Sequence, residues 1–480
     1  MEDNSKNVVI FSFVIYLVVL TNEQPNNTSS NFSKSVEICD KCDCTIYPNL
    51  FLLNCANRDL HNIFTIWPEH QNRTIRATFS NNVISTLEKF PNTNTSVMVS
   101  LDHCSIKYLS AGLFENMKNI KYIDLSYNLI TIEELSSEKF KGPYVKDEFE
   151  PIEVSHLNLA YNLIHSLPKS LFEHMPRLTT LNLEGNGIKI LDEQTKAALV
   201  SIGSLKHLNL ANNGLQQLPG DMLKSMTKLL KINLSKNRMT FVPNELANLN
   251  ALEVLILDSN PIFELTDGLF NGLHNLVELS LNNLSNVYEV HSNTFRPLKK
   301  LVKLHLSNNP DLDVFEPDAF GMEDNMSLRE VYLNNNNLID IPSVLLDWPS
   351  LHIFEFNNNP LMCSCNLYNI TKMLRRQITR LKAGPFCIGE EELSYQVFSL
   401  DDRVCKENYL PGLSFRTMTR AKFSMIRITL VTISLVALVG VFIVIVLIFM
   451  KQRKYGLLRN SQLSFSTTVL YNPLHGQPIL

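Results

Sequence analysis

A hydrophobic pattern with one fixed polar position recurs along most of the chain. The pattern is L-x-x-L-x-L-x-x-N-x-L, and Leu205, Leu208, Leu210, Asn213 and Leu215 show it in full. Its L-x-L core predicts a short β-strand, because alternate side chains of a strand face opposite sides. The polar position, called the ladder position here, recurs at residues 82, 104, 128, 162, 186, 213, 237, 260, 284, 309, 336 and 359. Most intervals are 22 to 27 residues long, and a period of that length predicts a solenoid of twelve stacked repeats.

The period also predicts how the stack is held together. Each strand should pair with the strand of the next repeat in one parallel sheet, with a spacing of about 4.8 Å. The ladder asparagine should turn inward and satisfy backbone groups that no strand partner reaches. A second apolar column is expected on the return side of the coil, formed by Phe114, Phe172, Leu223, Phe270, Phe295 and Phe320. No single repeat buries its own apolar edge, so the repeats must fold together.

This repeat resembles the "typical" class of extracellular leucine-rich repeats, which occurs in Toll-like receptors, Slit, the Nogo receptor, chaoptin and capricious. The resemblance covers about residues 39–405. It implies an α/β solenoid, a horseshoe with a parallel sheet on its concave face and a disulfide cap at each end.

The cysteines lie where such caps are expected. Four precede the first repeat (Cys39, Cys42, Cys44 and Cys55) and four follow the last (Cys363, Cys365, Cys387 and Cys405). Four cysteines allow three pairings each, and closely spaced cysteines are also zinc ligands. The resemblance implies the pairs Cys39–Cys44, Cys42–Cys55, Cys363–Cys387 and Cys365–Cys405. The ninth cysteine, Cys104, stands at a ladder position, so we expect it to be buried and unpaired.

Two apolar runs frame the repeats. Val8 to Leu20 is too short to span a bilayer and is typical of a signal peptide. Ile428 to Met450 has no charged residue and predicts a membrane-spanning helix. Charges on both sides of this run leave its orientation open, but the cysteines and the glycosylation sequons all precede it, which predicts an extracellular N-terminus. The sequons are at Asn26, Asn27, Asn31, Asn72, Asn94, Asn233, Asn283, Asn325 and Asn369.

These features divide the chain into eight segments. We expect a signal peptide, a glycosylated linker, an N-terminal cap, the repeats, a C-terminal cap, a stalk, a transmembrane helix and a cytoplasmic tail. Their bounds are 1–22, 23–38, 39–73, 74–361, 362–406, 407–427, 428–450 and 451–480.

The outward positions of the strands are the candidate ligand-binding residues, because a rigid sheet holds side chains in fixed geometry and lowers the entropic cost of binding. For any single residue, a merely solvated side chain is the commoner explanation. Val254 with Ile256 stands out as a possible apolar anchor on a polar face. The candidates are Tyr122, Asp124, His156, Asn158, Asn182, Glu184, His207, Asn209, Lys231, Val254, Ile256, Asp258, Glu278, Lys303, His305, Glu330, Tyr332, Ile353 and Glu355.

Two irregularities interrupt the repeats. The interval from Asn128 to Asn162 has 34 residues, about ten more than usual, and the surplus lies in the charge-rich stretch from Glu133 to Glu153. Long loops on scaffolds often carry function, but a solvated insertion is the commoner explanation. Leu284 replaces the ladder asparagine, and we expect the turn to bulge there.

Other function classes find little support. The sequence has no P-loop, H-E-x-x-H or G-x-S-x-G motif, so no catalytic residues, metal site or cofactor are predicted. A net charge of −4 argues against general nucleic-acid binding. The tail is too short for a signalling domain, so signalling would require a co-receptor, and Tyr455 with Leu458 resembles a Y-x-x-Φ sorting signal. The sequence therefore predicts a single-pass plasma-membrane protein that binds an extracellular protein as an adhesion molecule, receptor or co-receptor. A matrix-organising protein and a pattern-recognition receptor are the alternatives.

Overall fold

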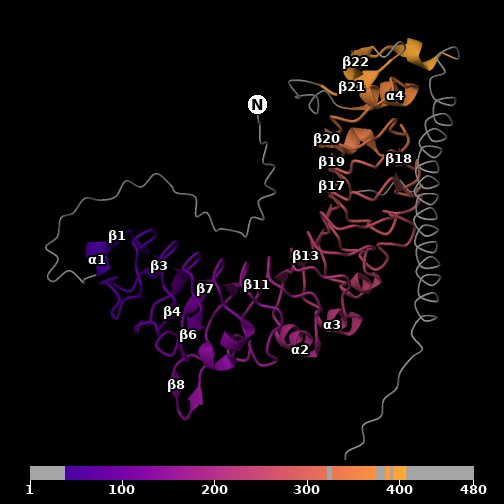
Figure 1. The fold of residues 1–480 in the computed structure, drawn as a ribbon. Coiled ribbons are helices and arrows are strands. Elements are labelled where there is room, and N and C mark those ends of the chain that lie inside the picture. The colour runs from indigo at the N-terminus through magenta and orange to yellow at the C-terminus, as the bar shows by residue number, and fades with distance from the viewer. Residues whose placement is uncertain (1–37, 322–326, 375–383, 390–392, 407–480) are drawn as a thin grey trace, which may run out of the picture. The chain divides into compact units, whose positions relative to one another are not determined.

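Residues 38–321, 327–374, 384–389 and 393–406 are described by a computed structural model. The chain divides into two compact units, Met1–Val404 and Cys405–Leu480. The first unit contains the N-terminal cap, all the repeats and the C-terminal cap up to Val404, in agreement with the predicted leucine-rich-repeat solenoid (Figure 1).

One long sheet connects the repeats. In the described part of the chain it has 14 strands in the order β1-β2-β3-β5-β7-β10-β11-β12-β13-β14-β15-β17-β19-β20. Strands β3 to β20 match the twelve predicted repeats one to one, and each pairs in parallel with the next. Their bounds are β3 Thr74–Thr78, β5 Val97–Ser100, β7 Ile120–Asp124, β10 His156–Asn158, β11 Thr180–Asn182, β12 His207–Asn209, β13 Lys231–Asn233, β14 Val254–Ile256, β15 Glu278–Ser280, β17 Lys303–His305, β19 Glu330–Tyr332 and β20 Ile353–Glu355.

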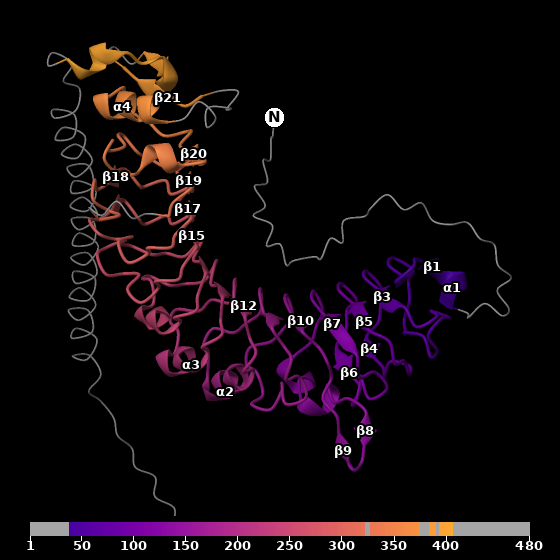
Figure 2. The ribbon, with the colours of Figure 1, turned by 180° about the vertical axis from the view of Figure 1, so that it is seen from behind.

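The return segments on the other side of the repeats are mostly turns. Figure 2 shows α2 (Glu193–Ser201) and α3 (Gly220–Ser225) opposite the sheet. Asp192 begins α2 as its N-cap and accepts a hydrogen bond from the Thr195 backbone N–H at 2.8 Å. The short strands here pair as β4 (Thr86–Leu87) with β6 (Tyr108–Leu109) and β16 (Glu289–Val290) with β18 (Val314–Phe315). The 3-10 helices are η1 Ile132–Glu134, η2 Ser137–Lys139, η3 Asn244–Asn248, η4 Trp348–Ser350, η6 Val397–Ser399 and η7 Asp402–Cys405.

The predicted phenylalanine column is confirmed and extends further than expected. Phe270 and Phe295 stack with ring centroids 5.9 Å apart, and Phe295 contacts Phe320 at 5.0 Å. Toward the N-terminus, Phe90 and Phe114 stack at 5.7 Å. These rings and the strand leucines form one continuous core through all the repeats, as expected for units that bury their apolar edges only against neighbours.

The ladder asparagines cross-link successive turns as predicted. The Asn237 Oδ1 accepts hydrogen bonds from the backbone N–H groups of Asn213, Gly214 and Leu215 at 2.9–3.1 Å. Its Nδ2 donates to the carbonyls of Leu210 and Leu234, both at 2.9 Å. It also donates to the Ser235 carbonyl at 3.3 Å, so one buried amide bonds to six backbone groups in a turn that no strand reaches.

Cys104 is buried and unpaired, as predicted for a ladder position. Its thiol donates to the Phe79 carbonyl at 3.0 Å, and burial raises its pKa to about 11. A thiol that stays protonated at neutral pH is a poor nucleophile, so its role here is structural.

The cysteine caps close both ends of the core. At the N-terminal end, α1 (Ile38–Lys41) and β1 (Asp43–Ile46) precede β2 (Leu50–Asn54), which is antiparallel to β1 and parallel to β3. The disulfides Cys39–Cys44 and Cys42–Cys55 hold this cap. The C-terminal cap contains α4 (Cys365–Met373), β21 (Phe386–Ile388) and β22 (Ser394–Gln396). Cys363 is bonded to Cys387, and Cys365 and Cys405 are also disulfide-bonded cysteines.

The long interval after Asn128 forms a β-hairpin that projects from the array (Figure 1). Strands β8 (Tyr144–Val145) and β9 (Glu148–Phe149) pair antiparallel around a turn at Lys146 and Asp147. At the second irregularity, Leu279 still pairs in register with Leu304, so the leucine at 284 leaves the sheet continuous.

Among the described residues, no helix is both long and apolar enough to cross a membrane. The predicted signal peptide (1–22), linker to residue 37, stalk (407–427), transmembrane helix (428–450) and tail with Tyr455 and Leu458 lie outside the described residues. The sequons Asn26, Asn27, Asn31 and Asn325 also lie outside them.

Candidate ligand-binding face

The strand register arranges the candidate residues in straight rows across the sheet face. From β7 to β20, the first row crosses each strand at its first outward position: Tyr122, His156, Thr180, His207, Lys231, Val254, Glu278, Lys303, Glu330 and Ile353. The second row, two residues later, is Asp124, Asn158, Asn182, Asn209, Asn233, Ile256, Ser280, His305, Tyr332 and Glu355.

This register corrects two sequence assignments. On β11 the first-row residue is Thr180, and Glu184 lies in the turn after the strand. Asp258 likewise lies beyond the end of β14. Both residues therefore belong to a third row in the turns, two residues after the second row.

Most of the second row is structural. The side-chain oxygens of Asn158, Asn182 and Asn209 accept hydrogen bonds from backbone N–H groups two residues later, at 3.0–3.1 Å. Asn182 and Asn209 are buried. The row thus caps the turns, and the exposed chemistry of the face comes mainly from the first row.

The predicted apolar anchor is wrong for Ile256, which is only 7% exposed. Asn233 and Ser280 flank it on the neighbouring strands, so its side chain is enclosed by the row. Val254 is half-buried beside it. Ile256→Glu would therefore place an unpaired charge in a buried site and destabilise the fold.

Asn233 is also poorly placed for glycosylation. It is 2% exposed, and its Oδ1 accepts a hydrogen bond from the Ser235 N–H at 2.9 Å. Asn72, Asn94 and Asn283 are exposed in loops, and Asn369 is half-buried in α4. The sheet face itself is therefore expected to carry no glycan.

The C-terminal half of the face carries paired charges. Lys303 forms an ion pair with Glu330 at 2.9 Å. His305 stacks on Tyr332 at 4.6 Å and lies 3.7 Å from Glu278. Burial lowers the pKa of His305 despite these carboxylates, so the ring is neutral at physiological pH.

The centre and N-terminal half contain partly buried polar groups. Burial lowers the pKa of His156, His207 and Lys231. Burial raises the pKa of Asp258 although Ser280 and Asn282 donate hydrogen bonds to it. Perturbed pKa values of this kind occur at functional sites and also at buried structural positions.

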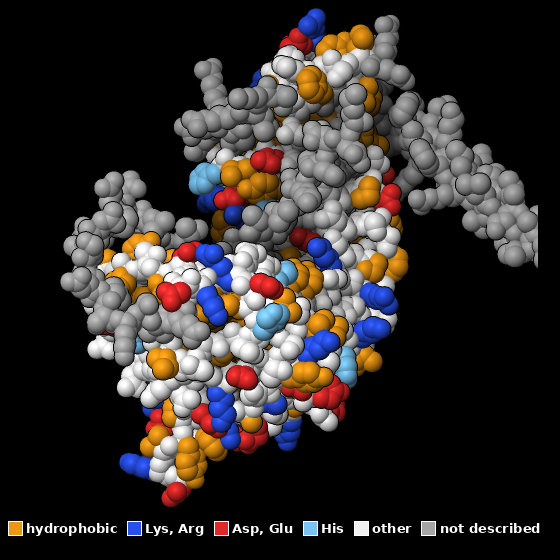
Figure 3. All heavy atoms as spheres, turned by 60° about the vertical axis from the view of Figure 1, so that its left-hand side comes forward, with side chains coloured by type: hydrophobic (Ala, Val, Ile, Leu, Met, Phe, Trp, Pro, Cys, Tyr) orange, Lys and Arg blue, Asp and Glu red, His pale blue; other side chains and the backbone are white. Residues whose placement is uncertain are grey.

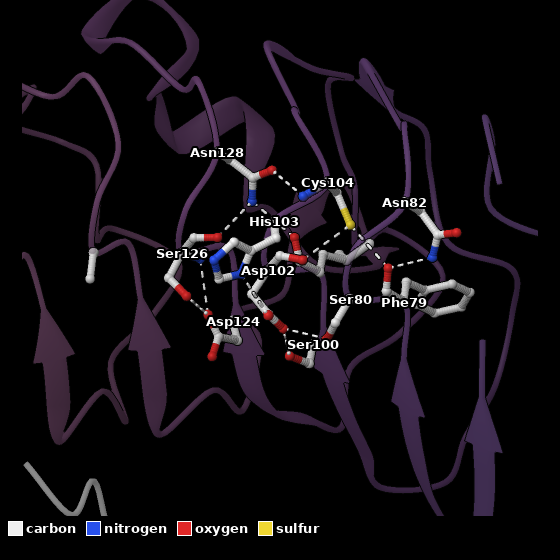
Figure 4. A network of polar contacts seen from close by, with 12 residues as sticks. Phe79, Ser80, Asn82, Ser100, Asp102, His103, Cys104, Asp124, Ser126 and Asn128 are labelled. Carbon is white, nitrogen blue, oxygen red and sulfur yellow. Dashed lines mark hydrogen bonds and ion pairs between the residues drawn. The ribbon is translucent and has the colours of Figure 1, made fainter. Parts of the chain in front are cut away.

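The turns beyond the second row hold a polar network that the sequence did not reveal (Figure 4). The Asp102 Oδ1 accepts hydrogen bonds from Ser80 Oγ at 2.5 Å and Ser100 Oγ at 2.6 Å, and His103 Nδ1 lies 3.1 Å from Asp102 Oδ2. Asp124 accepts similar bonds from the hydroxyls of Tyr122 and Ser126. These residues come together only when equivalent positions of successive repeats are aligned.

Figure 3 shows acidic, basic and hydrophobic side chains mixed over the exposed side of the first unit in that view. Among the described residues, no cluster of histidine, cysteine and carboxylate side chains is arranged to hold a metal ion.

Comparison with known proteins gives a consistent result. A family model described as "Leucine rich repeat" matches residues 152–205, 203–262 and 251–310. Tsukushi from Gallus gallus is 32% identical over 288 residues, which are 59% of this chain and 71% of that protein. Fibromodulin from Bos taurus is 27% identical, over 67% of this chain and 74% of its own length. A chain from the solved octameric complex of latrophilin 3, Unc5D and FLRT2 has the same fold, with a TM-score of 0.50, 20% identity and coverage of 75% of this chain and 98% of that one.

Proposed function

Because the chain belongs to the extracellular leucine-rich-repeat proteins with cysteine caps, the family that includes Tsukushi, we propose that it recognises a protein ligand through its sheet face. Proteins of this family act by binding and are not enzymes, and the same holds for this chain. The observation that carries the proposal is the unbroken register from β7 to β20, which fixes the first row as a rigid array of mixed chemistry.

The site of action in this proposal is the cell surface. The apolar runs at 8–20 and 428–450 support a type I, single-pass protein that acts as an adhesion molecule, receptor or co-receptor. Any signalling in this proposal would pass through a co-receptor.

A second candidate is a secreted, matrix-organising role. The similarity to fibromodulin over 74% of that protein's length favours it. The two candidates differ in where the full chain ends up, because a membrane helix retains the chain on cells and a matrix protein is released into the medium.

Two measurements test the proposal. The full chain with a C-terminal tag is expressed in cells, and alkaline carbonate extraction separates integral from released protein. Retention in the membrane pellet supports the cell-surface form, and recovery in the medium supports the matrix form. The tagged chain is then captured and screened against a library of secreted proteins and receptor ectodomains. Specific binding of at least one protein is expected, and the absence of any saturable binder would contradict the proposal.

A further inference from the structure

Three aromatic side chains form a stacked column at the edge of the sheet face. His103 stacks on Tyr127 with centroids 4.2 Å apart, and Tyr127 stacks on Tyr161 at 4.4 Å. Each residue immediately precedes a ladder position and has a φ of 53–55°. Bulky side chains are uncommon in this left-handed region, and Asn81 and Asn212 occupy the same position in other repeats. We call His103, Tyr127 and Tyr161 the ring column.

The ring column ends against a glycine that makes room for it. Gly185 follows Tyr161 at the equivalent position of the next repeat, and a Cβ there would lie 2.4 Å from Tyr161 Cδ1. The ring therefore lies directly over the glycine backbone. Two of the three side chains are open to solvent: Tyr127 is 45% exposed, and the His103 side chain is 48% exposed. The column presents exposed ring edges, while the ring faces cover one another.

A carboxylate lies at each end of the column. Asp102 contacts His103 at 3.1 Å, and Glu184 accepts a hydrogen bond from the Tyr161 hydroxyl at 2.8 Å. Burial would raise the pKa of Asp102, but hydrogen bonds from Ser100, Ser80 and His103 outweigh it and lower the pKa. The other donors to these two carboxylates are the neutral hydroxyls of Ser80 and Ser100 (Figure 4) and the amide of Asn209. Neither carboxylate forms an ion pair with a lysine or arginine of the described residues, so their negative charge is left for a ligand.

Only small side chains lie between the two carboxylates, and we call this surface, from Asp102 to Glu184, the strip. Asp102 and Glu184 belong to the third row, and the residues between them in that row are Ser126 and Ala160, which are small and buried. Three strand steps separate the carboxylates, which is about 14 Å at the spacing of a sheet. An extended peptide covers that length in about four residues.

From this geometry we propose that the strip binds an extended basic segment of a protein partner, with arginine or lysine side chains four residues apart. Their cationic heads would pair with Asp102 and Glu184, and their aliphatic stems would cover the exposed ring edges. A sugar would need an open ring face for stacking, and the column covers most of its faces. The inference rests on the proposed function, because it names the chemistry of the segment that the protein recognises.

The test uses the full chain and two labelled peptides of seven residues. One carries arginines at positions 2 and 6 in a Gly/Ser background, and the other carries citrulline at both. Fluorescence anisotropy at low and high salt should show binding of the arginine peptide only, weakened by salt. Asp102→Asn and Glu184→Gln keep the hydrogen-bonding shape but remove the charge. Each should raise Kd about threefold to tenfold, and the double variant about thirtyfold, as expected for partly exposed charge pairs.

Two further variants complete the design. Tyr127→Asn introduces the residue that Asn81 and Asn212 provide at this position, so it should fold normally and weaken binding about threefold. Asp311→Asn removes an exposed carboxylate elsewhere and should leave Kd unchanged. Thermal melts monitored by circular dichroism check that each variant is folded.

Several results would overturn the inference. No binding of the arginine peptide to the wild-type chain would do so, as would equal binding to the Asp102→Asn/Glu184→Gln double variant. Binding of a neutral oligosaccharide that responds to Tyr127→Asn but not to the carboxylate variants would assign the strip to a glycan. If a protein ligand from the screen binds the double variant normally, this inference fails while the proposed function stands. If the screen finds no protein ligand but the arginine peptide binds as expected, the proposed function fails while the basic-peptide site stands.

Discussion

Asn237→Leu should be among the most destabilising single substitutions in the repeats. Leucine fits the position sterically, since Leu284 occupies it natively in another repeat. The change removes six hydrogen bonds of 2.9–3.3 Å between the buried Asn237 amide and the backbone. At a net value of about 1 kcal/mol for each bond, with some relaxation of the turn, the loss is about 3–5 kcal/mol.

Urea unfolding measures this loss, with circular dichroism following the whole array. The chain has two tryptophans, and Trp67 and Trp348 report on opposite ends of the repeats. The matched control is Asn275→Leu, whose side chain makes an exposed hydrogen bond to the Asn250 carbonyl at 2.7 Å. The control should cost less than about 1 kcal/mol. Equal costs for the two variants would refute the view that the ladder amides hold the turns together.

Three further predictions follow from the packing, the histidines and the sequons. Phe295→Ala should cost about 3–5 kcal/mol in the same unfolding assay, because its ring is 1% exposed and contacts Phe270 and Phe320; a cost below about 1 kcal/mol would show that the column is not packed as described. Burial lowers the folded-state pKa values of three histidines, so the unfolded chain binds more protons than the folded chain as pH falls. Stability should therefore fall as pH drops below about 6.5. The melting temperature should decrease from pH 7.5 to 5.5, and this decrease should be much smaller in a variant with all three histidines changed to glutamine. The three are His156, His207 and His305. Glycopeptide mass spectrometry should find a glycan on exposed Asn94 and none on buried Asn233, and high occupancy of Asn233 would show that this row is open.

The repeat frame was predictable because it depends on one-dimensional spacing. The ladder column, the phenylalanine column and the position of Cys104 all follow from residues that recur at a fixed interval. The pairs Cys39–Cys44, Cys42–Cys55 and Cys363–Cys387 agree with the family resemblance.

The exposed chemistry was harder to predict because it depends on neighbours in adjacent repeats. Ile256 looked like a surface anchor along its own strand, but Asn233 and Ser280 on the flanking strands enclose it. The ring column was missed for the same reason. His103, Tyr127 and Tyr161 lie far apart in the sequence and look like ordinary turn residues until their column is aligned.

We expect the ligand to bind the sheet face and not the opposite side of the repeats. Glu278→Asn creates the sequon Asn-Leu-Ser in the first row, where the Glu278 side chain is 36% exposed. Glu193→Asn creates Asn-Gln-Thr on α2, where the Glu193 side chain is 89% exposed on the opposite side. Each variant needs one substitution, and a gel shift reversed by glycosidase confirms that the glycan is attached.

The decisive measurement is the affinity of both glycosylated variants for a protein ligand from the screen. The glycan at position 278 should abolish binding, and its enzymatic removal should restore binding. The glycan at position 193 should change Kd less than about twofold. Undiminished binding with a fully occupied glycan at position 278 would contradict this prediction.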